Sequence, residues 1–209
     1  MNRVLVLAPH PDDESIGCGG TLCGHVQQGD TVHVVFLTSG EQGGHGRPEE
    51  EIIRVREHEA RNAAKILGIR HLEFWREPDG AVRATRSAVT RLREKLAEFQ
   101  PHTIYVSHNR DLHPDHRGAV RLLSRALKDW RGTSPVVFMY EIWTPTQQLD
   151  HIVDITSYLK KKLAAVRAYR SQCAAIGLVA AIRGLNRYRG EMHSWPGGSY
   201  AEVFTRLKL

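Results

Sequence analysis

The sequence predicts an α/β fold: a Rossmann-like, doubly wound, mostly parallel sheet with helices on both faces. Three observations support this prediction. Short apolar runs alternate with longer helix-type segments along the chain. The short runs are almost continuously apolar, as expected for strands that are covered on both faces. No internal repeat, low-complexity tract or linker interrupts the alternation. We therefore expect one domain over residues 1–209, with residues 150–209 as part of it.

Seven short runs are rich in apolar, β-branched and aromatic residues, which favour strands. The expected strands are Arg3–Ala8, Thr31–Thr38, His71–Trp75, Thr103–Ser107, Pro135–Trp143, Ile152–Ile155 and Glu202–Leu207.

The segments between these strands have helical signals. Pro48–Leu67 is the clearest case: proline begins it, Glu49–Glu51 follow in the first turn, and Gly68 comes just after its end. The other expected helices are a glycine-containing stretch up to Gly29, Ala84–Phe99, Pro114–Trp130, Tyr158 to about Ser171, and a second stretch in the C-terminal third.

The charge is distributed unevenly along the chain. The 209 residues include 29 Lys and Arg and 23 Asp and Glu, which gives a net charge of +6. Residues 1–149 hold 19 basic and 19 acidic side chains, whereas residues 150–209 hold 10 and 4, so the whole excess lies in the last sixty residues. This distribution argues against a uniformly basic coat for nucleic acid, and we expect no nucleic-acid partner.

The composition also bears on location. The three cysteines cannot all pair, and their spacing does not suggest a disulfide framework, which favours a reducing compartment. Ala174–Ile182 is the longest apolar stretch and is much shorter than the roughly twenty residues that a bilayer span needs. The N-terminus becomes acidic too early for a signal peptide. We therefore expect a cytoplasmic protein without a membrane partner.

The first unusual segment is Pro9–Glu14, directly after the first strand. The two prolines stiffen the turn around His10, and three consecutive carboxylates (Asp12, Asp13 and Glu14) repel one another unless a cation relieves them. These carboxylates could also simply complement the N-terminus of the next helix.

The second unusual segment is Asp111–His116, directly after the fourth strand. Its histidines, His113 and His116, are three residues apart and share a face if a helix has begun. In a doubly wound sheet the first and fourth strands can be neighbours where the winding reverses, so the two segments would converge at one sheet edge. Two histidines and a carboxylate form the ligand set of catalytic zinc, and also that of non-haem iron.

At this point the residues show a family resemblance. His10-Pro11-Asp12-Asp13-Glu14, paired with His113-Pro114-Asp115-His116, resembles the two signature motifs of the LmbE-like/PIG-L family of zinc-dependent N-deacetylases. Arg56–Glu59, followed by Ala63–Gly68, is similar to a third segment of that family. The resemblance extends over nearly the whole chain.

The resemblance implies a role for each of several residues. The implied metal ligands are His10, Asp13 and His116. Asp12 matches the general base that activates the water at the metal. His113 matches the group that stabilises the oxyanion or protonates the leaving amine, with Asp115 orienting it. The implied substrate-contacting residues are Arg56 and Asp79. At Asp111 the chain departs from members that carry a tyrosine there.

The implied activity is removal of an N-acetyl or other N-acyl group from an N-acetylglucosamine-type sugar or glycoconjugate, with Zn²⁺ or another divalent metal as cofactor. The partner would be this small molecule. Hexamers and other oligomers occur among similar proteins, so a homo-oligomer is compatible with the resemblance. Two alternatives remain open: a non-haem Fe(II) enzyme on the same ligands, and a non-catalytic module that binds anions or nucleic acid through the basic C-terminal third.

Overall fold

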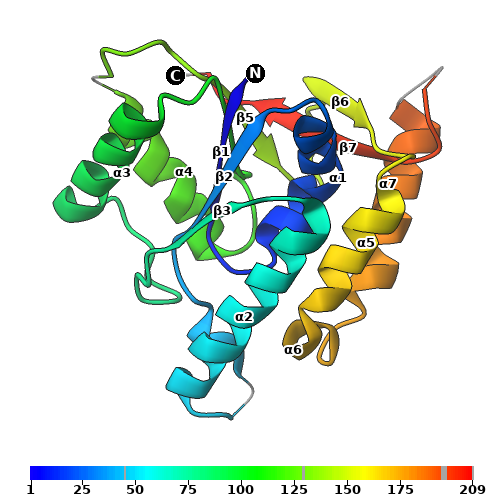
Figure 1. Ribbon diagram of the computed structural model, residues 1–209, viewed down its shortest axis with the longest axis horizontal. Helices are drawn as coiled ribbons and strands as arrows, with labels where there is room; N and C mark the ends of the chain where they lie inside the picture. Colours follow the sequence, from blue (N-terminus) through cyan, green and yellow to red (C-terminus); the bar gives the residue numbers. More distant parts are fainter. Residues whose placement is uncertain (45, 129, 194–196, 209) are drawn as a thin grey trace.

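The computed structural model describes residues 1–44, 46–128, 130–193 and 197–208, which form one twisted sheet with helices on both faces (Figure 1). The strands are β1 (Arg3–Ala8), β2 (Thr31–Phe36), β3 (His71–Phe74), β4 (Thr103–Ser107), β5 (Val136–Tyr140), β6 (His151–Asp154) and β7 (Ala201–Arg206). The helices are α1 (Asp13–Gln27), α2 (Glu49–Leu67), α3 (Arg86–Phe99), α4 (Pro114–Leu127), α5 (Leu159–Ala168), α6 (Arg170–Cys173) and α7 (Leu178–His193), and a 3₁₀ turn, η1, covers Glu41–Gly44.

The strand order explains where a ligand can bind. The order across the sheet is β3-β2-β1-β4-β5-β7-β6, and β1 pairs in parallel with β2 on one side and β4 on the other. The winding therefore reverses between β1 and β4, which opens a crevice at their carboxyl ends. The predicted Rossmann-like, mostly parallel sheet is confirmed.

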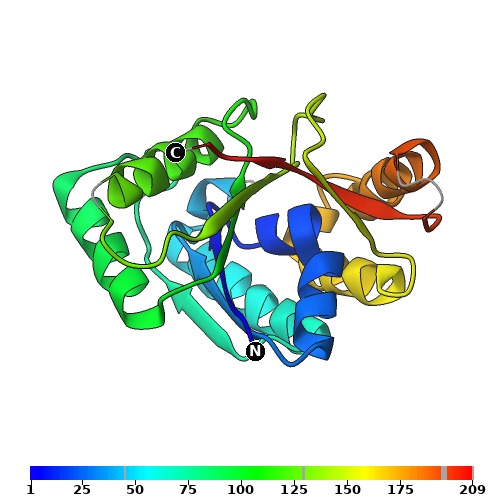
Figure 2. The same ribbon diagram turned by 90° about the horizontal axis from the view of Figure 1, so that it is seen from above.

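The apolar side chains alternate between the two faces of the sheet, as the period of a strand requires. On β1, Leu5 and Leu7 belong to the core cluster under α3 and α4, whereas Val4, Val6 and Ala8 belong to the cluster under α1, α2 and α5. Two views show these helix layers on opposite sides of the sheet (Figures 1 and 2). A strand buried on both faces needs the continuous apolar run that the sequence contains.

The last two strands do not continue the parallel order of the sheet. β7 lies antiparallel between β5 and β6, so the final segment of the chain inserts into the sheet instead of extending its edge. Nothing in the sequence pattern of a short apolar run specifies this position.

Some expected bounds were too long. The strand expected over Pro135–Trp143 ends at Tyr140, because the backbone N–H groups of Trp143 and Thr144 donate to the Asp111 side chain instead of to a neighbouring strand. The helix expected from Tyr158 to about Ser171 breaks at Tyr169, which has φ −80° and ψ 64°.

Two other helices also differ in length from the prediction. The helix expected over Ala84–Phe99 begins at Arg86, where the Thr85 hydroxyl accepts a hydrogen bond from the Ala88 N–H. The helix expected over Pro114–Trp130 ends at Leu127; within this expected range, Asp129 lies outside the described residues.

Among the described residues, no helix has both the length and the hydropathy needed to cross a bilayer.

Helix α1 approaches the sheet closely, and glycine makes this approach possible. A Cβ atom on Gly17 would lie 2.2 Å from the Tyr140 ring, and one on Gly20 would lie 2.6 Å from Ile155. Tyr140 is fully buried, and its hydroxyl donates to the carbonyl of Leu7. Because α1 begins at Asp13, within the first motif, this packing also determines where that motif lies.

We therefore expect Gly17→Ala to destabilise the protein by about 1–3 kcal/mol, because the added methyl overpacks a rigid aromatic contact. Gly24→Ala in the same helix is the matched control: its Cβ would lie 3.5 Å from Tyr158, an ordinary contact, and alanine favours a helix interior by about 0.5–1 kcal/mol. Urea unfolding measures both. Equal stability of the two variants would contradict the packing argument.

Candidate metal centre

The two motifs meet at the crevice between β1 and β4. His10 and Asp13 lie just after β1, and His116 lies in the first turn of α4, after β4. All three side chains are buried. The Asp13 carboxylate is held in place by the backbone N–H of His10, which donates to Oδ2 over 2.9 Å.

Three potential ligand atoms form a nearly equilateral triangle. Oδ2 of Asp13 lies 3.2 Å from Nδ1 of His10 and 3.3 Å from Nε2 of His116, and these two nitrogens are 3.3 Å apart. A tetrahedral zinc ion with bonds of about 2.0–2.1 Å has ligand atoms about 3.3–3.4 Å apart. The triangle therefore fits one face of such a coordination sphere and leaves a position free.

The charge around the triangle also favours a cation. The buried carboxylates include Asp13, Asp111 and Asp115, and burying them costs energy unless positive charge compensates. Although burial lowers the pKa of His116, the Asp13 and Asp111 carboxylates together raise it to about 9. The imidazole thus binds a proton where a metal ion would bind.

Carboxylates lie behind both histidines. Nε2 of His10 is 3.1 Å from Oδ1 of Asp79 and 3.3 Å from Oδ2 of Asp115, and Nδ1 of His116 is 3.0 Å from Oδ1 of Asp111. Such partners fix the orientation of a metal-binding imidazole and increase its basicity. Each histidine is therefore left with one nitrogen, Nδ1 in His10 and Nε2 in His116, for a metal.

The arrangement also brings together two wider sets of groups that could bind a metal. They are His10, His113 and His116, and His10, Asp79 and Asp115, and within each set the ligand atoms lie within 4.8 Å of one another. In the triangle with Asp13 all three edges are 3.2–3.3 Å and the other nitrogen of each histidine faces a carboxylate, so it is the candidate metal-binding set.

The Asp115 carboxylate does not have the neighbour that the sequence suggested. We expected it to orient His113, but it lies against His10 and accepts hydrogen bonds from the backbone N–H groups of Gly80 and Val82. The reason is helix geometry. Asp115 comes two residues after His113, and side chains two residues apart at a helix start do not face each other.

His113 itself caps helix α4. Its Nδ1 accepts a hydrogen bond from the backbone N–H of Asp115 over 3.2 Å. The neutral imidazole therefore carries its proton on Nε2. The ring lies 4.6 Å from the ring of His10, centroid to centroid, and burial lowers the pKa of His113. The side chain thus brings a neutral N–H donor to the metal centre.

Asp12 has an unusual backbone conformation. Its φ is 133°, a region that non-glycine residues rarely adopt, and it lies at the N-terminus of α1. The backbone N–H of Asp12 donates to the buried carboxylate of Glu14, which in turn accepts from the hydroxyl of Tyr169 over 2.6 Å. These contacts hold a strained residue in place at the edge of the cavity.

Arg56 compensates the charge of Asp12. Its guanidinium donates to the carbonyls of Pro11 and Gly40 and lies 3.2 Å from Oδ2 of Asp12. Burial raises the pKa of Asp12 to about 7, although the Arg56 guanidinium lowers it. We expected Arg56 to contact substrate; in the structure its hydrogen bonds support the first motif.

Asp79 likewise has partners within the protein. Oδ1 lies against His10, and Oδ2 accepts from the backbone N–H of Gln42. Both carboxylate oxygens are therefore engaged, although the residue lies at the cavity as the sequence suggested.

A cavity of about 260 Å³ opens over these residues. Its polar side contains the site residues, and its other side is apolar. The lining residues include His10, Asp12, Asp13, Arg56, Asp79, His113, Gln42, Gln172, Ile142, Trp143, Ile176 and Leu178.

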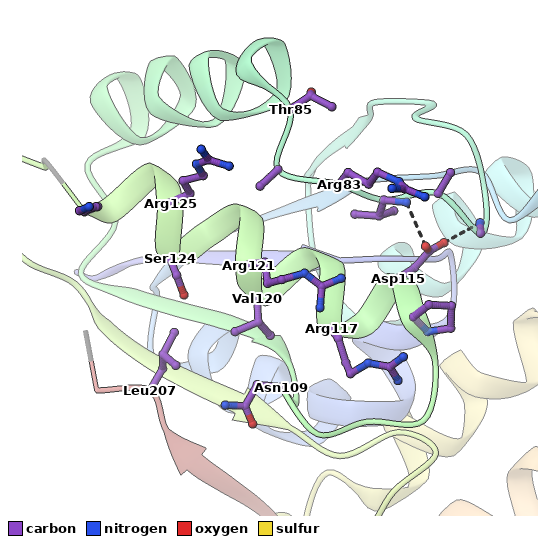
Figure 3. Close-up of a pocket in the computed structure, with 16 residues that line it drawn as sticks. Arg83, Thr85, Asn109, Asp115, Arg117, Val120, Arg121, Ser124, Arg125 and Leu207 are labelled. Atoms are coloured by element: carbon purple, nitrogen blue, oxygen red, sulfur yellow. Dashed lines mark hydrogen bonds between the residues drawn. The ribbon is translucent and has the colours of Figure 1, made fainter.

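A larger hollow, of about 1120 Å³, is separate from this chemistry. It runs along the outer side of α4, where Arg117, Arg121 and Arg125 project from successive turns (Figure 3). Of the expected site residues only Asp115 reaches it, and that carboxylate bonds the backbone of Gly80 and Val82. The smaller cavity is therefore the candidate functional site.

The sequence profile described as "PIG-L: GlcNAc-PI de-N-acetylase" matches residues 5–127, more than half of the chain. The chain belongs to the PIG-L family. This membership confirms the resemblance stated above and the expected enzyme class, an N-deacetylase.

Individual PIG-L relatives are similar over most of their length. A probable N-acetyl-alpha-D-glucosaminyl L-malate deacetylase 2 from Bacillus anthracis is 29% identical over 185 residues, which cover 82% of each chain. A 4-oxalmesaconate hydratase from Pseudomonas putida is 30% identical and covers 100% of this chain and 79% of its own. The structure of N,N'-diacetylchitobiose deacetylase from Pyrococcus horikoshii has a TM-score of 0.87 and 25% identity, covering 99% of this chain and 84% of that one.

The sequence reasoning missed several residues of the site. Asp111, which from the sequence was only a departure from family members with a tyrosine, contacts His116. Its position five residues before His116 in the same segment could have suggested this contact. Gln172 and Ile176 reach the cavity from the segment between α5 and α7, and no sequence signal indicates their position.

The backbone of Asp12 leads to a test. We expect Asp12→Gly to be more stable than Asp12→Ala by about 1 kcal/mol, because both lose the ion pair with Arg56 but only glycine adopts φ 133° without strain. Glu94, exposed within α3, is the control position, where alanine should exceed glycine by about 0.5–1 kcal/mol. Thermal unfolding measures all four variants. The same order at both positions would contradict the strain.

Proposed function

We propose that this chain is a single-domain, zinc-dependent N-deacetylase that removes the acetyl group from an N-acetylglucosamine-type sugar or glycoconjugate. The observation that carries the proposal is the triangle of His10 Nδ1, Asp13 Oδ2 and His116 Nε2, with edges of 3.2–3.3 Å, next to Asp12. Membership of the de-N-acetylase family and relatives named for glucosaminyl malate and chitobiose support it.

The metal-binding residues would be His10, Asp13 and His116. When bound, a divalent metal such as zinc supplies Lewis acidity, which polarises an amide carbonyl and lowers the pKa of water. Asp79 and Asp115 can accept the Nε2 proton of His10, and Asp111 forms an ion pair with His116 at Nδ1, so these carboxylates hold the two rings in place.

Asp12 would act as the general base. Oδ2 faces Arg56, so Oδ1 is the oxygen available to accept a proton from the attacking water. A positioned base of this kind contributes about a hundred- to ten-thousand-fold to the rate. The Arg56 guanidinium lowers the pKa of Asp12, which favours the charged carboxylate, and orients it in a buried site.

His113 would act on the other side of the amide. Its Nε2–H can donate to the carbonyl oxygen as negative charge develops there, and then to the nitrogen of the departing amine. Since Nδ1 already accepts the N–H of Asp115, the ring has one proton donor and one fixed orientation.

The direct test is acetate release by the zinc-loaded protein from N-acetylglucosamine, N,N'-diacetylchitobiose and N-acetylglucosaminyl malate. We expect acetate with a free amine as the second product. The hydratase relative covers this whole chain, so the same protein is also assayed for hydration of 4-oxalmesaconate by loss of ultraviolet absorbance. Hydration without acetate release from any substrate would overturn the proposal.

The roles of the base and a ligand can be separated. We expect Asp12→Asn to retain one zinc per chain and lose about a hundred- to ten-thousand-fold in kcat. His116→Ala should lose both zinc and activity. His58→Ala, which changes an exposed histidine of α2, should retain both. Metal analysis and acetate release measure the three variants, and a full rate in Asp12→Asn would refute the assignment of the base.

The carboxylate behind His116 gives another prediction. We expect Asp111→Asn to weaken zinc affinity about ten- to a hundred-fold, because the Nδ1 proton of His116 loses a charged acceptor. Asp150→Asn, an exposed carboxylate at the start of β6, is the matched control and should leave the affinity unchanged. Competition with a chelating dye measures the dissociation constants, and equal affinities for the two variants would contradict the role of Asp111.

A further inference from the structure

Apart from the proposed metal, the described residues of the candidate site offer little positive charge to an anionic substituent. Arg56 is the only arginine or lysine among the described residues that line the cavity. The two terminal nitrogens of its guanidinium are engaged by the carbonyls of Gly40 and Pro11 and the carboxylate of Asp12, and only the buried Nε has no partner. A carboxylate or phosphate on a substituent that lies away from the metal position would therefore meet no free side-chain cation in this cavity, which is unfavourable in a partly buried site.

The basic C-terminal third does not supply that partner. Arg189 is buried and pairs with Glu141, and Arg187 pairs with Glu191 one helical turn away. Neither arginine lines the cavity. None of the lysines or arginines of residues 150–209 is among the described residues that line the cavity.

The outer wall of the cavity is apolar and exposed. Trp143 is 48% exposed and Ile176 is 45% exposed, and both line the cavity. Two of the six large hydrophobic side chains that are exposed among the described residues therefore lie at this one cavity, and such grouping is typical of a ligand-binding surface.

This wall is held rigidly relative to the metal centre. Oδ2 of Asp111 accepts the backbone N–H groups of Trp143 and Thr144, while Oδ1 accepts the N–H of His113 and faces His116. One buried carboxylate therefore connects the tryptophan segment to both histidines of the second motif. A preformed surface loses little entropy when a ligand binds.

We propose that Trp143 and Ile176 form a subsite for the substituent carried by the N-acetylated sugar, and that this substituent is uncharged with an apolar face. The apolar face of a second sugar ring and an aryl or alkyl group share this chemistry. A carboxylate-bearing substituent, such as malate, is disfavoured. This inference rests on the proposed function, because it concerns the substrate of the same cavity.

Binding is measured first and needs no turnover. Calorimetry compares phenyl β-glucosaminide, chitobiose that keeps the N-acetyl group on its second ring, and glucosaminyl malate, which are amine products of the proposed reaction. We expect the phenyl compound and chitobiose to bind at least about ten-fold more tightly than the malate compound, since only they bury apolar surface on the wall. Trp143→Ala should abolish this preference. Trp130→Ala is the matched control and should retain the preference, because Trp130 packs against the core cluster under α3 and α4.

Turnover is measured next with the corresponding N-acetylated substrates. We expect kcat/KM to follow the same order, with the loss in Trp143→Ala appearing mainly in KM. Ile176→Arg adds the missing cation and should shift the preference towards the malate substrate by about ten-fold.

The outcomes separate the two proposals. Acetate release with the malate compound as the preferred ligand, or an unchanged preference in Trp143→Ala, overturns the subsite and leaves the deacetylase standing. The expected binding order without acetate release from any substrate overturns the deacetylase and supports the subsite. The comparison of phenyl glycoside with chitobiose then shows which apolar group the wall accepts better.

Discussion

The parallel pairing of β1 with β4 is the constraint on which the rest of the site depends. Val4 to Leu7 are in register with Thr103 to Val106, so the two strands end side by side at the same edge of the sheet. The chain leaves β1 towards β2 and leaves β4 towards β5, in opposite directions. The segments that follow these strands therefore face each other across a crevice, and His10 and His116, 106 residues apart, come within 3.3 Å.

That proximity gathers many ionisable groups into a buried volume, and the fold balances them in pairs. Asp79 and Asp115 lie against His10, Asp111 lies against His116, and Arg56 lies against Asp12. Each carboxylate also accepts backbone N–H groups or faces a cation, so the cost of burial is offset locally. The net charge that remains is negative, and it lies around the three converging ligand atoms.

Two buried carboxylates, those of Glu14 and Asp111, also fix the backbone by accepting its N–H groups. Glu14 holds the N–H of Asp12 in a conformation with φ 133°, and Asp111 holds both the start of α4 and the segment of Trp143. Stability and function therefore depend on the same hydrogen bonds. A protein that keeps a strained residue at its candidate base supports it with the surrounding structure, here through Glu14 and Tyr169.

Much of this protein is determined by sequence alone. The alternation of apolar runs and helical segments predicts the sheet and its layers, because burial on both faces requires that pattern. The two His/Asp motifs at strand ends identify most of the cluster, since prolines and neighbouring carboxylates are local features. Only the tertiary structure decides the rest. The antiparallel insertion of β7, the contact of Asp115 with His10, and the reach of Ile176 into the cavity depend on contacts between distant segments, which no local pattern encodes.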